Sequence, residues 1–194
     1  MNFFLSRFLI PVLTLAVSGS ENWFTSNFSV VGSRFPQSLL LLSWAILIGT
    51  FYHISVNRSV GQTTPFLNPR TELLMTDLSA CFLLGAALLP YRPDQMPLTS
   101  MLHLYLAFSS TVLFFLAVTI ADLKLYTLAP DLFSLPSGLL IFAIAVTLCL
   151  LILCRFMITS ALEIFLTLFS CAWLQIFDRR ITIFLRRKRM YFRV

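Results

Sequence analysis

The chain has 194 residues, of which 58% are hydrophobic and only 11% are charged, and its mean hydropathy is +0.88. An average soluble domain is about 45–50% apolar and about 25% charged. So little charge cannot cover the surface of a water-soluble globule of this size. The composition therefore excludes a soluble enzyme, a free nucleic-acid-binding domain and a disordered chain. We expect an all-α, polytopic membrane protein that forms one helical bundle over residues 1–194, contacts membrane lipids and has no nucleic-acid partner.

Six apolar segments are candidates for membrane spans, because a helix needs about 20 largely apolar residues to cross the hydrocarbon core. The first segment is interpreted as a span rather than as a signal peptide, since no small-x-small cleavage pattern follows it. Four prolines, at positions 36, 90, 97 and 136, are placed at the edges of the segments. A tight turn at Arg155 joins the last two. The predicted spans cover residues 3–18, 37–55, 72–89, 99–120, 137–154 and 156–177.

The positive charge of the chain is concentrated behind the last span. The formal net charge is +6, and seven of the 14 Lys and Arg residues lie in the last 16 positions. A basic cluster after a hydrophobic span is typical of a cytoplasmic flank that contacts anionic lipid headgroups. The tail 178–194 is therefore predicted to be cytoplasmic, and its headgroup contacts are predicted to be Arg179, Arg180, Arg186, Arg187, Lys188 and Arg189.

The other basic residues favour an orientation with both termini in the cytoplasm. With six spans, that orientation places 11 of the 14 basic residues inside and leaves only Arg34, Arg92 and Arg155 outside. The first external loop, residues 21–34, mixes aromatic side chains with amides and hydroxyls and is expected to lie at the membrane interface. The tail segment 181–185 either lies flat on the inner leaflet or extends the last helix.

Ionisable side chains at membrane depth are costly, so each one is a candidate for function. His53 and Asp77 fall near the predicted inner face, with Asp77 roughly 8 Å deep. These two side chains are expected to be able to meet. Their contact is either functional or a structural link between helices, and the nearby wet interface favours the structural interpretation. Four further acids are expected to be ordinary boundary charges: Glu72, Asp122, Asp131 and Asp178.

His103 and Glu163 fall roughly 6–10 Å below the predicted outer face and form a second polar layer. If their helices touch, the acid can orient the imidazole and raise its basicity, which suits a general base. The alternative is that both residues are interhelical hydrogen-bonding groups without chemistry, which is common in membrane bundles. Other polar groups expected near this pair are Asn27, Ser29 and Ser160.

Motifs of known chemistry are absent from the sequence. Its four cysteines show no metal-ligand spacing, and no phosphate loop, nucleophile elbow or zinc-protease motif is present. We therefore expect no metal and no cofactor.

Three short segments carry a resemblance to a known family: residues 27–32 after the first span, residues 85–90, and Leu102-His103 at the start of the fourth span. Together with residues 160–165, they resemble a bacterial family of six-span membrane proteins of unknown function, distantly similar to the DRAM-type and FRAG-type membrane proteins. Val30 and Val31 depart from that family, which often has an acidic residue before the glycine. The resemblance implies a six-helix bundle in the bacterial cytoplasmic membrane and implies no activity.

The first functional hypothesis is a non-enzymatic integral membrane protein that acts through lipid or protein contacts in the bilayer, with a membrane-protein partner or a second copy of itself. The alternative is an outer-leaflet lipid-processing enzyme that uses His103 as the base and Glu163 as its orienting group. A third hypothesis is a small transporter or an accessory subunit of a membrane complex. The sequence does not decide among them.

Overall fold

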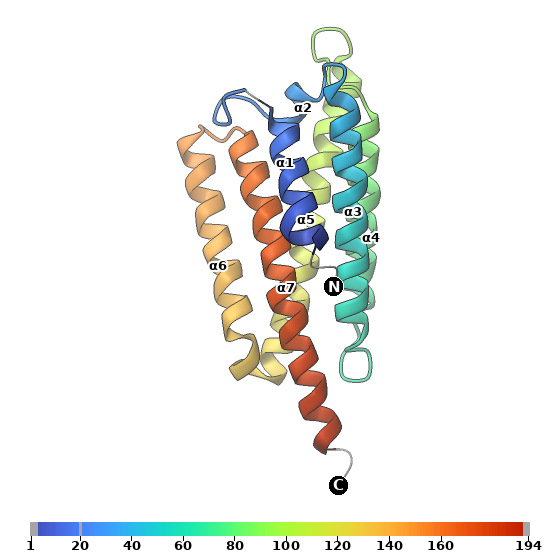
Figure 1. The fold of residues 1–194 in the computed structure, drawn as a ribbon, viewed down its shortest axis with the longest axis vertical. Helices are drawn as coiled ribbons and strands as arrows, with labels where there is room; N and C mark the ends of the chain where they lie inside the picture. Colours follow the sequence, from blue (N-terminus) through green and yellow to red (C-terminus); the bar gives the residue numbers. More distant parts are fainter. Residues whose placement is uncertain (1–3, 20, 192–194) are drawn as a thin grey trace.

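The computed structural model describes residues 4–19 and 21–191 and shows a bundle of long helices (Figure 1). The described residues contain helices and loops only, so the predicted all-α class is confirmed for them. The elements in chain order are the π-helix η1 (Leu5–Leu9), α1 (Ile10–Ser18), α2 (Phe28–Val31), α3 (Gln37–Gly61), α4 (Arg70–Leu88), α5 (Pro97–Leu128), α6 (Pro130–Leu153) and α7 (Ser160–Tyr191).

Five of these helices, α3 to α7, are long and apolar enough to cross a membrane. They correspond to the second to sixth predicted spans. The N-terminal helix Leu5–Ser18 is apolar but shorter. At 1.5 Å per residue it is about 20 Å long, against about 30 Å for a hydrocarbon core. A multi-pass membrane protein is therefore supported by five helices, and the sixth span remains a prediction.

Several predicted helix boundaries were wrong. Helix α6 begins at Pro130, so Pro136 lies inside the helix rather than at its edge. A proline inside a helix deprives the carbonyl four residues before it of its amide donor, and membrane helices tolerate this. The carbonyl of Pro136 itself accepts a hydrogen bond of 3.0 Å from Trp173 Nε1 on α7. Helices α3 and α5 continue to Gly61 and Leu128, beyond the predicted apolar segments.

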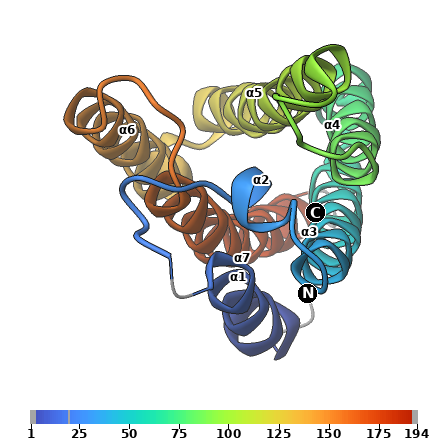
Figure 2. The ribbon, with the colours of Figure 1, turned by 90° about the horizontal axis from the view of Figure 1, so that it is seen from above.

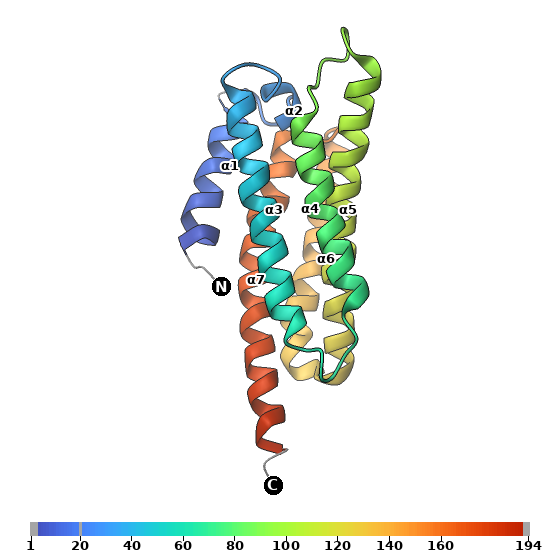
Figure 3. The same cartoon turned by 90° about the vertical axis from the view of Figure 1, so that its right-hand side faces the viewer.

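The last helix also differs from the prediction, at both of its ends. It begins at Ser160, after a turn in which Arg155 and Phe156 have φ values of 53° and 61°, which a right-handed helix cannot accommodate. At the other end it continues through the basic tail to Tyr191. The tail is thus an extension of the last helix, and it projects beyond the other helices (Figure 3). The alternative of a separate segment lying flat on the membrane does not match the structure.

Consecutive long helices run antiparallel and pack as neighbours in the order α3, α4, α5, α6, α7. Helix α7 also packs against α3, and α1 lies against both of them (Figure 2). One end of the bundle carries α2, the α4–α5 loop and the α6–α7 turn, and we call it the α2 end. The opposite end carries the α3–α4 and α5–α6 connections and the end of α7, and we call it the basic end.

The interior of the bundle is filled by apolar and aromatic side chains. Trp173 stacks on Phe177 with ring centroids 4.5 Å apart, and Phe133 packs edge-on against Phe177 and Phe184. Tyr52 stacks on Phe114 on the other side of the same core. Many large apolar side chains also point outward, as expected where lipid surrounds the protein.

Candidate functional site at the α2 end

Helix α2 has only four residues and lies over the centre of the bundle, with α3, α5 and α7 around it (Figure 2). A helix this short has no stability of its own. Its first turn is capped by Asn27, whose Oδ1 accepts a hydrogen bond from Val30 N at 2.9 Å. The predicted candidate Asn27 is thus the N-cap of α2. Everything else that holds α2 in place comes from other helices.

Glu163 on α7 is one of these attachments. Its Oε2 accepts a hydrogen bond of 2.8 Å from Phe28 N, at the start of α2. In return, two amides of the first turn of α7 donate to the loop before α2: Ser160 N to Ser26 O at 2.7 Å, and Ala161 N to Trp23 O at 2.9 Å. Backbone amides in the first turn of each helix have no acceptor within that helix, and here they donate to the other segment instead. Glu163 fastens α2 to α7.

His103 on α5 is the second attachment. Its Nε2 lies 2.7 Å from Ser29 Oγ on α2, and its Nδ1 lies 3.0 Å from the Leu89 carbonyl oxygen. A carbonyl oxygen only accepts, so Nδ1 carries the proton and donates to it. In the neutral ring Nε2 is then the acceptor, and the Ser29 hydroxyl donates to it. His103 and Ser29 are 4% and 8% exposed, so this contact is nearly closed to solvent and lipid.

The structure does not pair His103 with Glu163 directly. Both side chains lie near the α2 end, as their predicted depths required, but α2 stands between them and each binds a different residue of α2. No hydrogen bond joins the two among the described residues. The group that orients the imidazole is the Leu89 carbonyl rather than the predicted Glu163. Both residues lie in one layer, as expected from their positions, but residues 28–31, interpreted from sequence as part of an interfacial loop, form the helix that separates them.

A close backbone approach completes the attachment of α2. A Cβ built on Gly32 would lie 2.9 Å from the Phe28 carbonyl oxygen and 3.0 Å from Leu41 Cβ on α3. Glycine is therefore required sterically at this position.

The Ser160 hydroxyl, another predicted candidate, is fully buried and has no hydrogen-bond partner in the described structure. Its backbone amide, and not its side chain, makes the contact with the loop.

The predicted contact between His53 and Asp77 is present nearer the basic end. His53 Nδ1 lies 2.8 Å from Asp77 Oδ1, and Asn57 Nδ2 donates to the same oxygen at 3.1 Å. The side chains of His53 and Asp77 are 48% and 47% exposed. The three groups form a polar link between α3 and α4 at their surface.

Two acids that were expected to be boundary charges are buried instead. Glu72 is 1% exposed and forms an ion pair with Lys124 of α5 at 2.5 Å. Asp122 is also 1% exposed and accepts a hydrogen bond from Ser137 of α6. The prediction was wrong for both because position along a span does not say which side of the helix faces the bundle. Each acid links α5 to a neighbouring helix.

The predicted headgroup contacts lie on α7 at the basic end. Arg187 is paired with Asp131 of α6, and Lys188 Nζ lies 5.8 Å from the centre of the Phe184 ring. Arg179 is exposed, and Arg180 is half-buried. The Arg189 side chain lies outside the described residues.

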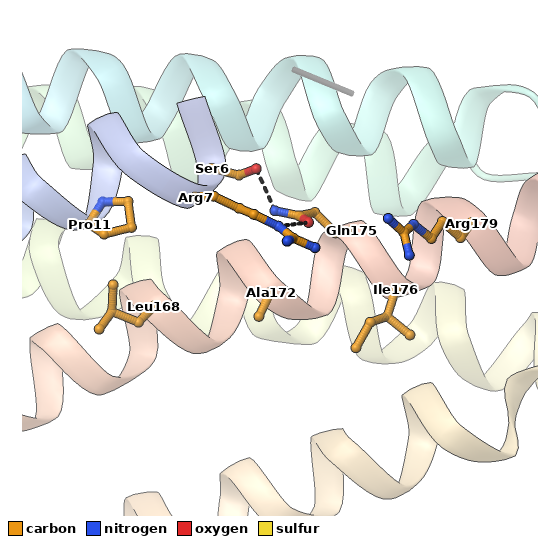
Figure 4. A pocket seen from close by; sticks show the side chains of 8 residues that line it. All are labelled: Ser6, Arg7, Pro11, Leu168, Ala172, Gln175, Ile176 and Arg179. Atoms are coloured by element: carbon orange, nitrogen blue, oxygen red, sulfur yellow. Dashed lines mark hydrogen bonds between the residues drawn. The ribbon is translucent and has the colours of Figure 1, made fainter. Parts of the chain in front are cut away.

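A groove that the sequence analysis did not predict runs between the N-terminal helix and α7 (Figure 4). Within it Arg7 Nε donates to Gln175 Oε1 at 3.1 Å, and Gln175 Nε2 donates to Ser6 Oγ at 2.5 Å. The signal that could have found it is Gln175, a polar residue inside the last predicted span, at a depth comparable with Arg7 of the first.

In the part of the chain that the structure describes, no three His, Cys, Asp or Glu side chains lie close enough together to hold a metal ion. No protein-family model, curated protein or solved structure matches the chain.

Proposed function

We propose that the chain is a non-enzymatic protein of the bacterial cytoplasmic membrane that acts through lipid or protein contacts within the bilayer. One observation carries this proposal. The polar residues that looked most like a catalytic set, Ser29, His103 and Glu163, are all engaged in holding α2 between α5 and α7. Two of the three are nearly inaccessible. The outer surface of the long helices is largely apolar, which suits contact with lipid chains or with apolar helices of a partner.

The proposal includes six spans with both termini in the cytoplasm. The distribution of charge over the two ends of the bundle supports this orientation. At the α2 end the basic residues are Arg34, Arg92 and Arg155. At the basic end they include Arg58, Arg70, Lys124, Arg179, Arg180, Arg186, Arg187 and Lys188. The resemblance to six-span proteins distantly similar to DRAM-type and FRAG-type proteins is part of this proposal.

A second candidate function, lipid hydrolysis at the leaflet on the α2 side, is favoured by the contact between Ser29 and His103. A hydroxyl that donates to an imidazole, whose other nitrogen is fixed by a third group, has the arrangement of an activated nucleophile. Ser29 would be the nucleophile and His103 the base, in place of the pair predicted from sequence. The reaction would require α2 to expose Ser29 to a lipid ester.

One experiment separates the two functions. The purified full-length chain is reconstituted in phospholipid vesicles and treated with a fluorophosphonate, which forms an adduct with activated serines. Ser29→Ala serves as the blank and Ser43→Ala as the matched control, because Ser43 is an exposed serine bonded only to the Leu39 carbonyl of its own helix. The non-enzymatic function predicts no adduct on Ser29 and no lysophospholipid or free fatty acid. An adduct that disappears only in Ser29→Ala would overturn it in favour of the hydrolase.

A further inference from the structure

The groove beside the N-terminal helix is separate from the attachments of α2. It has a volume of about 360 Å³ and lies between the N-terminal helix and α7 (Figure 4). Four side chains with polar groups and four apolar ones line it: Ser6, Arg7, Gln175 and Arg179, with Pro11, Leu168, Ala172 and Ile176. None of these residues takes part in the contacts around Ser29, His103 or Glu163. We call it the Arg7–Arg179 groove.

The lining residues of α7 form one stripe along the helix. Positions 168, 172, 175, 176 and 179 are separated by three or four residues, with 175 and 176 adjacent, so they share a face. The stripe is apolar at Leu168 and Ala172 and ends in a cation at Arg179. It covers about 16 Å of helix. The groove therefore changes from apolar to cationic in the direction of the basic end.

One of the two cations of the groove is held in position by hydrogen bonds. Gln175 accepts from Arg7 Nε and donates to Ser6, so it holds the Arg7 side chain against α7. Arg179 lies one turn further along the same face and is exposed (Figure 4). Among the residues that the structure describes, no carboxylate lines the groove. The nearest acid in sequence, Asp178, accepts a hydrogen bond from Ser59 of α3.

Arg179 lies at the depth where lipid phosphates are expected, and Arg7 lies about one helical turn deeper, at the level of Gln175. Arg179 follows Ser160, the start of α7, by 19 residues, which is about 28 Å of helix. A hydrocarbon core is about 30 Å thick, so Arg179 falls close to the polar boundary at the basic end. Leu168 and Ala172 then lie among acyl chains. Guanidinium groups bind phosphate oxygens through paired hydrogen bonds.

We propose that the Arg7–Arg179 groove binds one anionic glycerophospholipid from the leaflet at the basic end. The phosphodiester lies between Arg7 and Arg179, and one acyl chain follows Ile176, Ala172 and Leu168. This inference rests on the proposed membrane function and gives it a ligand class. A phospholipid fits the groove because a single molecule combines an anion with an apolar chain in the order in which the stripe presents them.

The test is native mass spectrometry of the full-length chain released from nanodiscs made of equal parts phosphatidylglycerol and phosphatidylcholine. We expect retained phosphatidylglycerol on the wild-type chain. Each of Arg7→Gln and Arg179→Gln should weaken this retention by at least about tenfold, the effect of losing a charge-assisted hydrogen bond to the phosphate. Arg58→Gln is the matched control, because it removes an exposed arginine of the basic end that does not line the groove. It should leave the retention unchanged.

A second variant tests the apolar part. Ala172→Trp fills the groove without removing charge and should abolish retention, while the far-ultraviolet circular dichroism and thermal unfolding of the chain stay close to wild type. If it unfolds, Ala172→Leu is used in its place.

Equal retention of the two lipids would overturn the proposal, and so would an equal loss in Arg58→Gln. Displacement of the lipid by glycerol 3-phosphate would also overturn it, because the groove would then bind a free phosphate. None of these results depends on labelling of Ser29, so this proposal and the proposed function can fail separately.

Discussion

The Ser29 hydroxyl on α2 donates to Nε2 of His103 on α5 at 2.7 Å, and this one contact joins a four-residue helix to a helix of 32 residues. Glu163 provides the corresponding link to α7 through Phe28 N. Because α2 donates one hydrogen bond to α5 and one to α7, it connects these two helices at the α2 end. His103 and Glu163 thus cooperate through α2 without touching each other.

The Ser29–His103 hydrogen bond should appear as a coupling in a double-mutant cycle. Ser29→Ala and His103→Phe should each lower the free energy of unfolding in a lipid bicelle. Together they should lower it less than the sum, with a coupling of about 0.6 kcal/mol, the average for hydrogen bonds between membrane helices, and at most about 1.7 kcal/mol. Ser43→Ala combined with His103→Phe should be additive. Additivity of Ser29→Ala with His103→Phe would contradict the contact.

Glu163 should be replaceable by glutamine but not by alanine. Glutamine keeps an oxygen that can accept from Phe28 N, whereas alanine leaves a half-buried amide without its partner. We expect Glu163→Ala to lower the free energy of unfolding by about 1–2 kcal/mol and Glu163→Gln to lower it by less than half of that. Thermal unfolding of the two variants side by side measures the difference. Equal losses would show that the charge, rather than the acceptor oxygen, matters.

Gly32→Ala should be destabilising because the new methyl group meets the Phe28 carbonyl and Leu41. Overpacking of this kind costs about 1–3 kcal/mol. Gly138→Ala is the matched control, since nothing lies within 4 Å of its Cβ position inside α6. There the change should be neutral or should stabilise the helix by up to about 1 kcal/mol. Equal unfolding midpoints for the two variants would contradict the close approach of α2 to α3.

The buried ion pair between Glu72 and Lys124 should be sensitive to the loss of one partner. Lys124→Met leaves the buried carboxylate of Glu72 without a counter-charge, so we expect a loss of about 3 kcal/mol. This is the lower end of the range for broken buried pairs, because the Lys124 side chain is 38% exposed. Adding Glu72→Gln to Lys124→Met should recover part of the loss. Chemical unfolding of the single and the double variant measures the loss and the recovery, and an absence of recovery would contradict the buried ion pair.

The long helices could be predicted from sequence because hydropathy reports directly on burial in lipid. Boundaries were less predictable, since a helix continues past the hydrocarbon wherever its backbone bonds are satisfied. Helix α7 extends to Tyr191 in this way, and α6 continues through Pro136. Neither effect is visible in a hydropathy profile.

The candidate site was predicted in part. Depth along the helices predicted that His103 and Glu163 lie in one layer and that His53 can contact Asp77, as it does in the structure. Depth does not specify which way a side chain points around the helix axis, so the burial of Glu72 and Asp122 was missed. Helix α2 was missed for a different reason: a four-residue helix is determined by its tertiary hydrogen bonds and leaves no periodic pattern.

Hydrogen–deuterium exchange of the peptide that covers Asn27 to Gly32 tests most directly whether His103 and Glu163 hold α2 in place. The full-length chain in nanodiscs is compared with His103→Ala and with Glu163→Ala, and peptides from the centre of α5 serve as the internal reference. Because each variant removes one of the two side-chain acceptors that bind α2 from α5 and α7, we predict faster exchange in α2 for both and unchanged exchange in the reference peptides. Unchanged exchange in α2 in either variant would contradict the account.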